Sequence, residues 1–170
     1  MEYTIKGLKT FRGTDGHGFN AHLYRDGVKV AFVINAGTGG DTTFEWVDFK
    51  EPRIDVQMTD YNGQPYTMQC TPEEAKLHEF VKGKTCYYMP EWNNENEPLT
   101  PEFLIMELVD KMENERRFKK MCKTKVLFRL KSDNTNEWRS LNGTFTPQVK
   151  ALIVNKFGDQ LDSIMNETLG

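Results

Sequence analysis

Apolar and polar residues alternate along the first part of the chain, as in antiparallel β-strands with one buried face. Residues 19–25 and 28–35 flank Asp26-Gly27, a dipeptide that suits the tight turn of a β-hairpin. Residues 28–35 are apolar on both faces, which is typical of an interior strand covered on both sides. Further alternating segments lie at residues 42–47, 54–58 and 66–70. The pattern predicts an antiparallel N-terminal sheet built as a meander of hairpins.

Three Thr-Pro pairs predict where three helices begin. A Thr side chain can accept a hydrogen bond from an unpaired backbone N–H at a helix start, and Pro suits the first helical position because it has no N–H to leave unpaired. The pairs begin at Thr71, Thr100 and Thr146. We therefore predict helices over residues 72–81, from residue 101 onwards and over residues 147–157, with Gly158 ending the third.

The second predicted helix changes its apolar pattern midway. The stripe of its first half consists of Ile105, Leu108, Val109 and Met112. The stripe lapses over residues 113–117 and resumes, on a shifted face, at Phe118, Met121 and Cys122. This pattern predicts either a kink or a polar second half that projects from the body of the protein.

The C-terminal part of the pattern indicates a hairpin between two helices. Residues 124–130 and 137–141 alternate around a polar loop, and residues 161–169 suit either a short helix or a terminal strand. The predicted fold is therefore α+β, with the N-terminal sheet, about three helices and a C-terminal αββα segment. We expect one domain over residues 1–170. The alternative is two subdomains, a β-rich 1–89 and an αββα 100–170, joined by an acidic, Asn-rich loop at residues 90–99.

Charge is distributed unevenly along this chain of 170 residues. Residues 111–131 hold nine Lys or Arg and two Glu, a formal charge of +7, so the other residues sum to −10 in a chain of −3. A field of one sign on one surface selects acidic partners. The predicted basic surface comprises Arg116, Arg117, Lys119, Lys120, Lys123, Lys125, Arg129, Lys131 and Arg139. The alternative is a solvated helix face that pairs with the acidic residues 91–110 of the same chain.

Two tryptophans are candidate interface residues. Trp138 falls on the strand predicted to pair with the basic strand, and Trp92 falls in the polar loop. Aromatic side chains beside cations would stack on nucleic-acid bases or anchor a protein interface. Packing in the core is the alternative for Trp138.

Motifs for catalysis and metal binding are absent from the sequence. The Gly-rich stretch 37–40 lacks the Lys of a phosphate-binding loop and joins two predicted strands. No HExxH, Cys/His cluster or GxSxG is present, so we predict no metal and no cofactor, and the sequence disfavours an enzyme without excluding one. A small hydrolase, with carboxylates that meet His17, His22 or His78 in space, is the alternative.

The compartment is predicted from the cysteines and the N-terminus. Three cysteines are an odd number with no CxxC spacing, and no basic, apolar leader or membrane span is visible. These features favour the reducing cytoplasm and no membrane partner.

Two blocks resemble small proteins that are carried by bacteriophages and prophages. The blocks are residues 18–33, GFNAHLYRDGVKVAFV, and residues 123–131, KTKVLFRLK. The resemblance implies an accessory protein that acts in the cytoplasm of a bacterial host, and it carries no activity or site residues with it. The resulting hypothesis is a non-enzymatic interaction protein that binds and inhibits a host or defence-system macromolecule, as an anti-CRISPR-like inhibitor does. A nucleic-acid-binding accessory protein that uses the same basic surface is the alternative, and the oligomeric state stays open.

Overall fold

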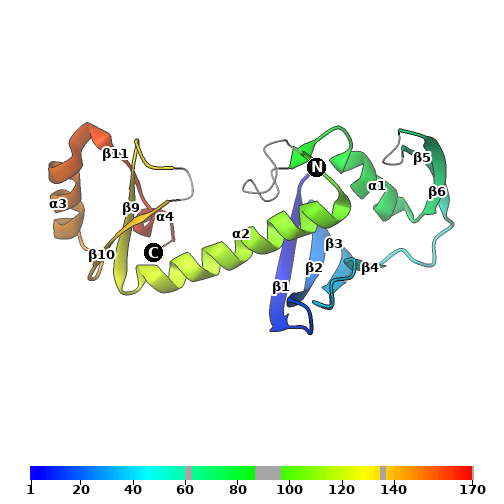
Figure 1. The fold of residues 1–170 in the computed structure, drawn as a ribbon, viewed down its shortest axis with the longest axis horizontal. Coiled ribbons are helices and arrows are strands. Elements are labelled where there is room, and N and C mark those ends of the chain that lie inside the picture. Colours follow the sequence, from blue (N-terminus) through cyan, green and yellow to red (C-terminus); the bar gives the residue numbers. More distant parts are fainter. Residues whose placement is uncertain (60–62, 87–96, 135–136, 170) are drawn as a thin grey trace. The chain divides into compact units, whose positions relative to one another are not determined.

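The chain forms two compact units in the computed structural model, which describes residues 1–59, 63–86, 97–134 and 137–169 (Figure 1). Unit 1 is Met1–Asp110 and unit 2 is Lys111–Gly170. The boundary falls inside helix α2, Pro101–Cys122, and not in the loop at residues 90–99. The α+β class and the antiparallel N-terminal sheet are confirmed. The prediction of a single domain stays a prediction.

Unit 1 contains a four-stranded antiparallel sheet in the order β1-β2-β3-β4, the predicted meander (Figure 1). Its strands are β1 (Tyr3–Arg12), β2 (His17–Arg25), β3 (Val28–Asn35) and β4 (Thr43–Trp46). Asp26 and Gly27 turn the chain between β2 and β3 with φ angles of 48° and 82°. These are the two positive φ values that a tight hairpin turn requires.

The two faces of this sheet are buried to different degrees. Ala31 and Val33 of β3 are fully buried, and they pair with the equally buried Leu23 and Ala21 of β2. Phe32, whose ring centroid lies 5.0 Å from that of His22, is only half-buried on the opposite face. β3 is therefore an interior strand, as predicted, but the expected cover on both sides is complete on one side only.

The Gly-rich stretch 37–40 belongs to the connection between β3 and β4 and packs against the β1–β2 loop. The backbone N–H of Asp15 donates to the carbonyl oxygen of Gly37 over 2.9 Å. A Cβ atom on Gly13 would lie 2.2 Å from the same oxygen, so only glycine fits there. The stretch is a close-packed hairpin connection and does not lead into a helix.

Besides the first half of α2, unit 1 contains two further strand pairs and one helix. β5 (Ile54–Thr59) pairs with β6 (Pro65–Cys70), β7 (Thr85–Cys86) pairs with β8 (Glu97–Pro98), and α1 spans Pro72–Val81. α1 begins where Thr71-Pro72 predicts. The Thr71 hydroxyl accepts the N–H of Glu74 at 3.3 Å, and the Glu74 carboxylate accepts the N–H of Thr71 at 3.2 Å.

A charged contact fixes α1 against the four-stranded sheet. The Nε and Nη2 atoms of Arg25 on β2 donate to the two carboxylate oxygens of Glu73 at 2.8 and 3.0 Å. The buried Asp48, after β4, accepts the backbone N–H of Glu73 at 2.9 Å. The guanidinium of Arg25 is the largest cause of the lowered pKa of Glu73. The first turn of α1 is thus held by β2, the segment after β4 and its own cap.

Unit 2 is a three-stranded antiparallel sheet in the order β10-β9-β11. β9 spans Lys125–Leu130, β10 Arg139–Asn142 and β11 Leu161–Ile164. The predicted hairpin is β9–β10, and α3 covers Pro147–Phe157 as expected. A 3-10 turn, Gly158–Gln160, leads from α3 into β11. Residues 161–169 form both predicted alternatives, the strand β11 and then the one-turn helix α4, Asn166–Leu169.

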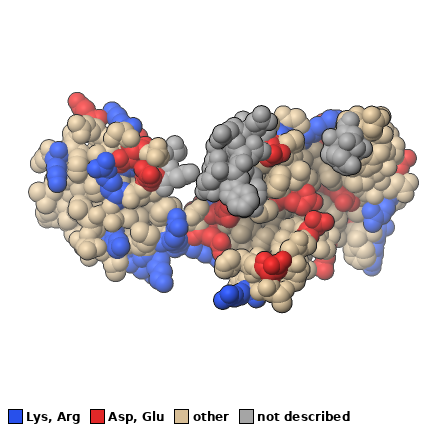
Figure 2. Space-filling model, viewed as in Figure 1, with Lys and Arg blue, Asp and Glu red and all other residues tan. Residues whose placement is uncertain are grey.

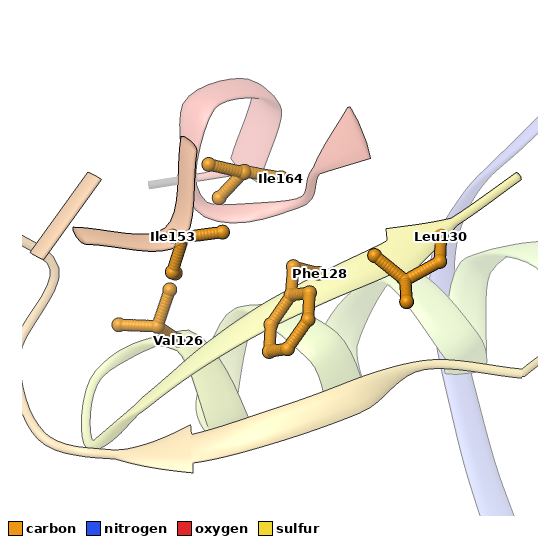
Figure 3. Close-up of a cluster of buried hydrophobic side chains, with 5 residues drawn as sticks. All are labelled: Val126, Phe128, Leu130, Ile153 and Ile164. Atoms are coloured by element: carbon orange, nitrogen blue, oxygen red, sulfur yellow. The ribbon is translucent and has the colours of Figure 1, made fainter. Parts of the chain in front are cut away.

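β9 is the central strand of unit 2, and both of its faces are buried. Val126, Phe128 and Leu130 project from one side toward Ile153 of α3 and Ile164 of β11 (Figure 3). Leu127 projects from the other side into a second cluster with Cys122 and Met165. The sheet therefore lies between α3 on one face and the end of α2 on the other.

Asn166 ties the end of α2 to β9. Its side chain is 5% exposed, and its amide nitrogen donates to the carbonyl oxygens of Cys122 and Lys125 at 3.2 and 2.9 Å. Its amide oxygen accepts the N–H of Leu127 at 2.8 Å. These bonds pair backbone groups at the end of α2 and in the first residues of β9. Groups at such a junction need a side-chain partner where neither the helix nor the sheet supplies one.

We expect Asn166→Ala to destabilise unit 2 by about 2–3 kcal/mol, because it leaves the buried N–H of Leu127 without an acceptor. Urea unfolding, with amide hydrogen exchange at Leu127 as the local measurement, checks this. Asn155→Ala is the matched control, since Asn155 is an exposed residue of α3. Equal stability of the two variants would contradict the role given to Asn166.

Candidate interaction surface

The second half of α2 presents its basic side chains to solvent. Phe118, Met121 and Cys122 pack in unit 2 against the second cluster. At about 100° per residue, Arg116 and Lys120 point to the opposite side of the helix. Both are exposed, as are Arg117, Lys119 and the following Lys123. Figure 2 shows Lys and Arg side chains gathered over this end of α2.

Among the described residues, Lys119, Lys120 and Lys123 take part in no ion pair. Ion pairs between described residues of unit 2 join Arg129 to Asp162, Arg139 to Asp133 and Lys150 to Glu167. None of these pairs involves Lys119, Lys120 or Lys123. We call these three lysines, with Arg116 and Arg117, the basic helix surface; the guanidinium of Arg117 also lies 5.0 Å from the ring centroid of Phe118.

The arginines of the strands, by contrast, are held by carboxylates. Arg129 on β9 donates to Asp162 from Nη2 at 2.6 Å and from Nε at 2.8 Å, and these bonds lower the pKa of Asp162. Arg139 on β10 donates hydrogen bonds from Nη2 and Nε to the two carboxylate oxygens of Asp133, at 2.7 and 2.8 Å. Paired cations attract an external anion less, so the predicted surface is strongest on the helix.

The two remaining strand cations differ in exposure. Lys125 is half-buried at the start of β9, and Lys131 is exposed just after it. The positive charge of Lys131 contributes to the lowered pKa of Asp162. The predicted basic residues are thus brought together in one unit, but they divide into an exposed helical set and a strand set that is partly paired.

Trp138 packs inside unit 2. Its ring centroid lies 6.2 Å from that of Phe118, and the guanidinium of Arg129 lies 5.0 Å from the ring. The indole is therefore half-buried, with Phe118 of the second cluster beside it and the cation of Arg129 against its ring. Trp92, and residues 91–96 of the acidic loop, lie outside the described residues.

The sign of the charge changes between the two units. Unit 1 has ten Lys or Arg against eighteen Asp or Glu, a formal charge of −8, and unit 2 has twelve against seven, a formal charge of +5. The boundary in α2 separates Asp110 from Lys111. The basic surface therefore belongs to a unit that is basic as a whole.

In the described part of the chain, the three histidines do not line one common cavity. Within the described residues, no three His, Cys, Asp or Glu side chains gather as metal ligands would. His78 of α1 lines a cavity of about 780 Å³ together with Glu79 and Glu102, and neither His17 nor His22 lines it. No helix in the described part of the chain is both long and apolar enough to cross a membrane.

One group of residues was missed by the sequence analysis. Phe44 and Trp46 of β4 stack with ring centroids 5.4 Å apart and an angle of 9° between the rings. They line a hollow of about 520 Å³ with Phe32 and with Phe49, whose side chain is 65% exposed. The signal is present in FEWVDF at residues 44–49, but the alternation there predicts only a strand.

Comparisons of the chain with protein-family models, with curated proteins and with solved structures find no match. The resemblance to small phage proteins therefore rests on the two sequence blocks alone.

The Arg139 ion pair and the N–H of Leu130 hold the pKa of Asp133 at about 2, below its ordinary value of 3.8. A carboxyl group whose pKa is lowered on folding stabilises the folded protein at pH values above its ordinary pKa of 3.8. This stabilisation is lost as the pH falls from 3.8 toward 2. In Arg139→Gln the pKa should rise toward 3.8. An NMR titration of the Asp133 carboxyl carbon measures it.

Lys150→Gln, which removes a different ion pair of unit 2, should leave the Asp133 titration unchanged. A midpoint near 3.8 for Asp133 in the unaltered protein would show that the Arg139 pair does not form in solution.

Proposed function

We propose that this protein is a non-enzymatic interaction protein that binds and inhibits a host macromolecule through the basic helix surface. The supporting observation is that Lys119, Lys120 and Lys123 are exposed and take part in none of the ion pairs of the described residues, while the opposite side of α2 is packed. Such a surface attracts an acidic partner and speeds its encounter.

The inhibitory role and the setting rest on sequence context. The two blocks that resemble phage proteins support an accessory protein of a phage or mobile element, directed against a host or defence system as anti-CRISPR-like proteins are. The proposed place of action is the cytoplasm of a bacterial host, where the three buried thiols, none in a disulfide, would stay reduced.

The overall charge favours an acidic protein as the partner over a long nucleic acid. The chain carries −3 and unit 1 carries −8, so an extended polyanion would attract unit 2 and repel unit 1. An acidic patch on a protein is confined and can meet the basic helix surface alone. The partner therefore needs clustered carboxylates that fit one exposed turn of α2.

Nucleic acid remains the second candidate, because of the spacing of the cations. Lys119 and Lys120 lie in the last turn of α2 and Lys123 directly follows it, so each could meet a phosphate. The contacts would be made by lysines to phosphates, so binding here would be electrostatic and largely independent of sequence.

Capture from a bacterial lysate treated with nuclease tests the proposal. The unaltered chain should retain a protein at low salt, and Lys120→Glu should reduce its retention by about tenfold or more, because an attraction becomes a repulsion. Lys156→Glu is the matched control, since Lys156 is an exposed lysine of α3, on the other face of the unit 2 sheet. Adding the chain to the activity assay of the retained protein measures inhibition.

Binding to labelled duplex DNA and to single-stranded RNA across a salt series separates the two candidates. Nucleic acid would be the ligand if three results occur together. Binding is tight and weakens steeply with salt, Lys120→Glu abolishes it, and no protein is retained from the nuclease-treated lysate. If Lys120→Glu and Lys156→Glu retain the partner equally well, the basic helix surface is not the binding surface in either candidate function.

A further inference from the structure

The hollow of about 520 Å³ beside β4 lies entirely within unit 1 and is walled by aromatic rings. Phe32 comes from β3, Phe44 and Trp46 from β4, and Phe49 from the segment after β4. Its volume is within the range of sites that hold a small molecule. We call it the aromatic hollow.

The aromatic rings leave apolar area open to solvent. Phe49 is 65% exposed and the adjacent Val47 is 52% exposed. Phe44 and Trp46, which are half-buried, lie nearly parallel at 9° and so offer flat ring surfaces rather than a rounded apolar pocket. A planar ring that covers Phe49 would remove this area from water and would gain stacking with its neighbours.

The charged residues that line the hollow determine which sign of charge a ligand can carry. Lys29 and Arg53, both exposed, line it against one carboxylate, that of Glu45. Arg53 is oriented by its Nη1 atom, which donates to the carbonyl oxygen of Gln69 at 3.2 Å. Aromatic walls also suit a quaternary ammonium group, but two cations at the rim repel it. The hollow thus favours a planar ring that carries negative charge.

We propose that the aromatic hollow binds a nucleobase together with its adjacent phosphate, either as a free nucleotide or as one unit of a single strand. The base stacks on the Trp46 and Phe49 side of the hollow, and the phosphate meets Lys29 and Arg53. Stacking tolerates every base, because each has a π-face. This site goes beyond the proposed function, since it uses unit 1 and none of the residues of the basic helix surface.

Titration of the full-length chain with AMP, and separately with a short single-stranded oligo-dA, tests the proposal by NMR and calorimetry. The indole N–H of Trp46 and the amide of Phe49 should shift. Phe49→Ala, which alters an exposed side chain and so spares the fold, should weaken binding by about tenfold or more. Lys29→Gln should also weaken binding, because one contact to the phosphate is lost. The affinity of this variant should depend less on salt than that of the unaltered chain.

Two controls make the test specific to the hollow. Tyr66→Ala removes an aromatic side chain that is 45% exposed and does not line the hollow, and Lys120→Glu alters the basic helix surface. Neither should change the affinity for AMP. Binding of AMP and oligo-dA with similar affinity indicates a nucleotide ligand, and much tighter binding of oligo-dA indicates a single strand; both support the site.

Three results would overturn the proposal. The first is no binding of either probe at millimolar concentration. The second is binding that Lys120→Glu abolishes and Phe49→Ala leaves intact, which would assign nucleic acid to unit 2. The third is a shift of Trp46 with tetramethylammonium and none with AMP, which would assign the hollow to a cation.

Discussion

The two units share one helix, and the change of its apolar face governs what each unit exposes. The buried side chains of the first half of α2 are Leu104, Ile105 and Val109, and those that pack in unit 2 are Phe118, Met121 and Cys122. At about 100° per residue, the second stripe is rotated by roughly 120° from the first. The helix is unbroken from Pro101 to Cys122, so neither stripe continues through the other half. Residues 113–117, which are all polar, separate the two apolar stripes.

The basic helix surface follows from this rotation. Arg116, Lys119 and Lys120 continue the direction of the first apolar stripe, but in unit 2 that direction faces solvent. The strand cations are constrained differently. The register of β11 against β9 shifts between Leu161 and Ser163, which leaves Asp162 as the extra residue beside Arg129. Among the described residues, Lys119 and Lys120 on this side of the helix join no ion pair, whereas Arg129, on a strand with neighbours on both sides, meets the carboxylate of Asp162.

Local chemistry was predictable from the sequence, and long-range pairing was not. Thr71-Pro72 and Asp26-Gly27 fix a helix start and a turn through their own backbone preferences, and both formed as expected. The pairing of β11 with β9 joins segments about thirty residues apart, and short strands carry no signal for their partner. For the same reason the sequence indicated nine cations, but it could not show that Arg129 and Arg139 are held by Asp162 and Asp133. The aromatic hollow needs three segments to meet, which one alternating pattern cannot reveal.

The basic helix surface and the aromatic hollow act over different distances, and this difference constrains how the protein can select a partner. Lysines on a helix attract any dense negative charge across about 10 Å of solvent, and salt weakens that attraction. The rings around Trp46 and Phe49 act only on contact and require a flat ligand, so salt affects them little. Electrostatic attraction therefore supplies the rate of encounter, while selectivity must come from surfaces that fit by shape. In this chain the residues that can discriminate by shape lie in unit 1, although its charge of −8 opposes the approach of polyanions. A ligand of the aromatic hollow, as proposed, has to be anionic enough for Lys29 and Arg53, yet small enough to avoid the acidic remainder of unit 1.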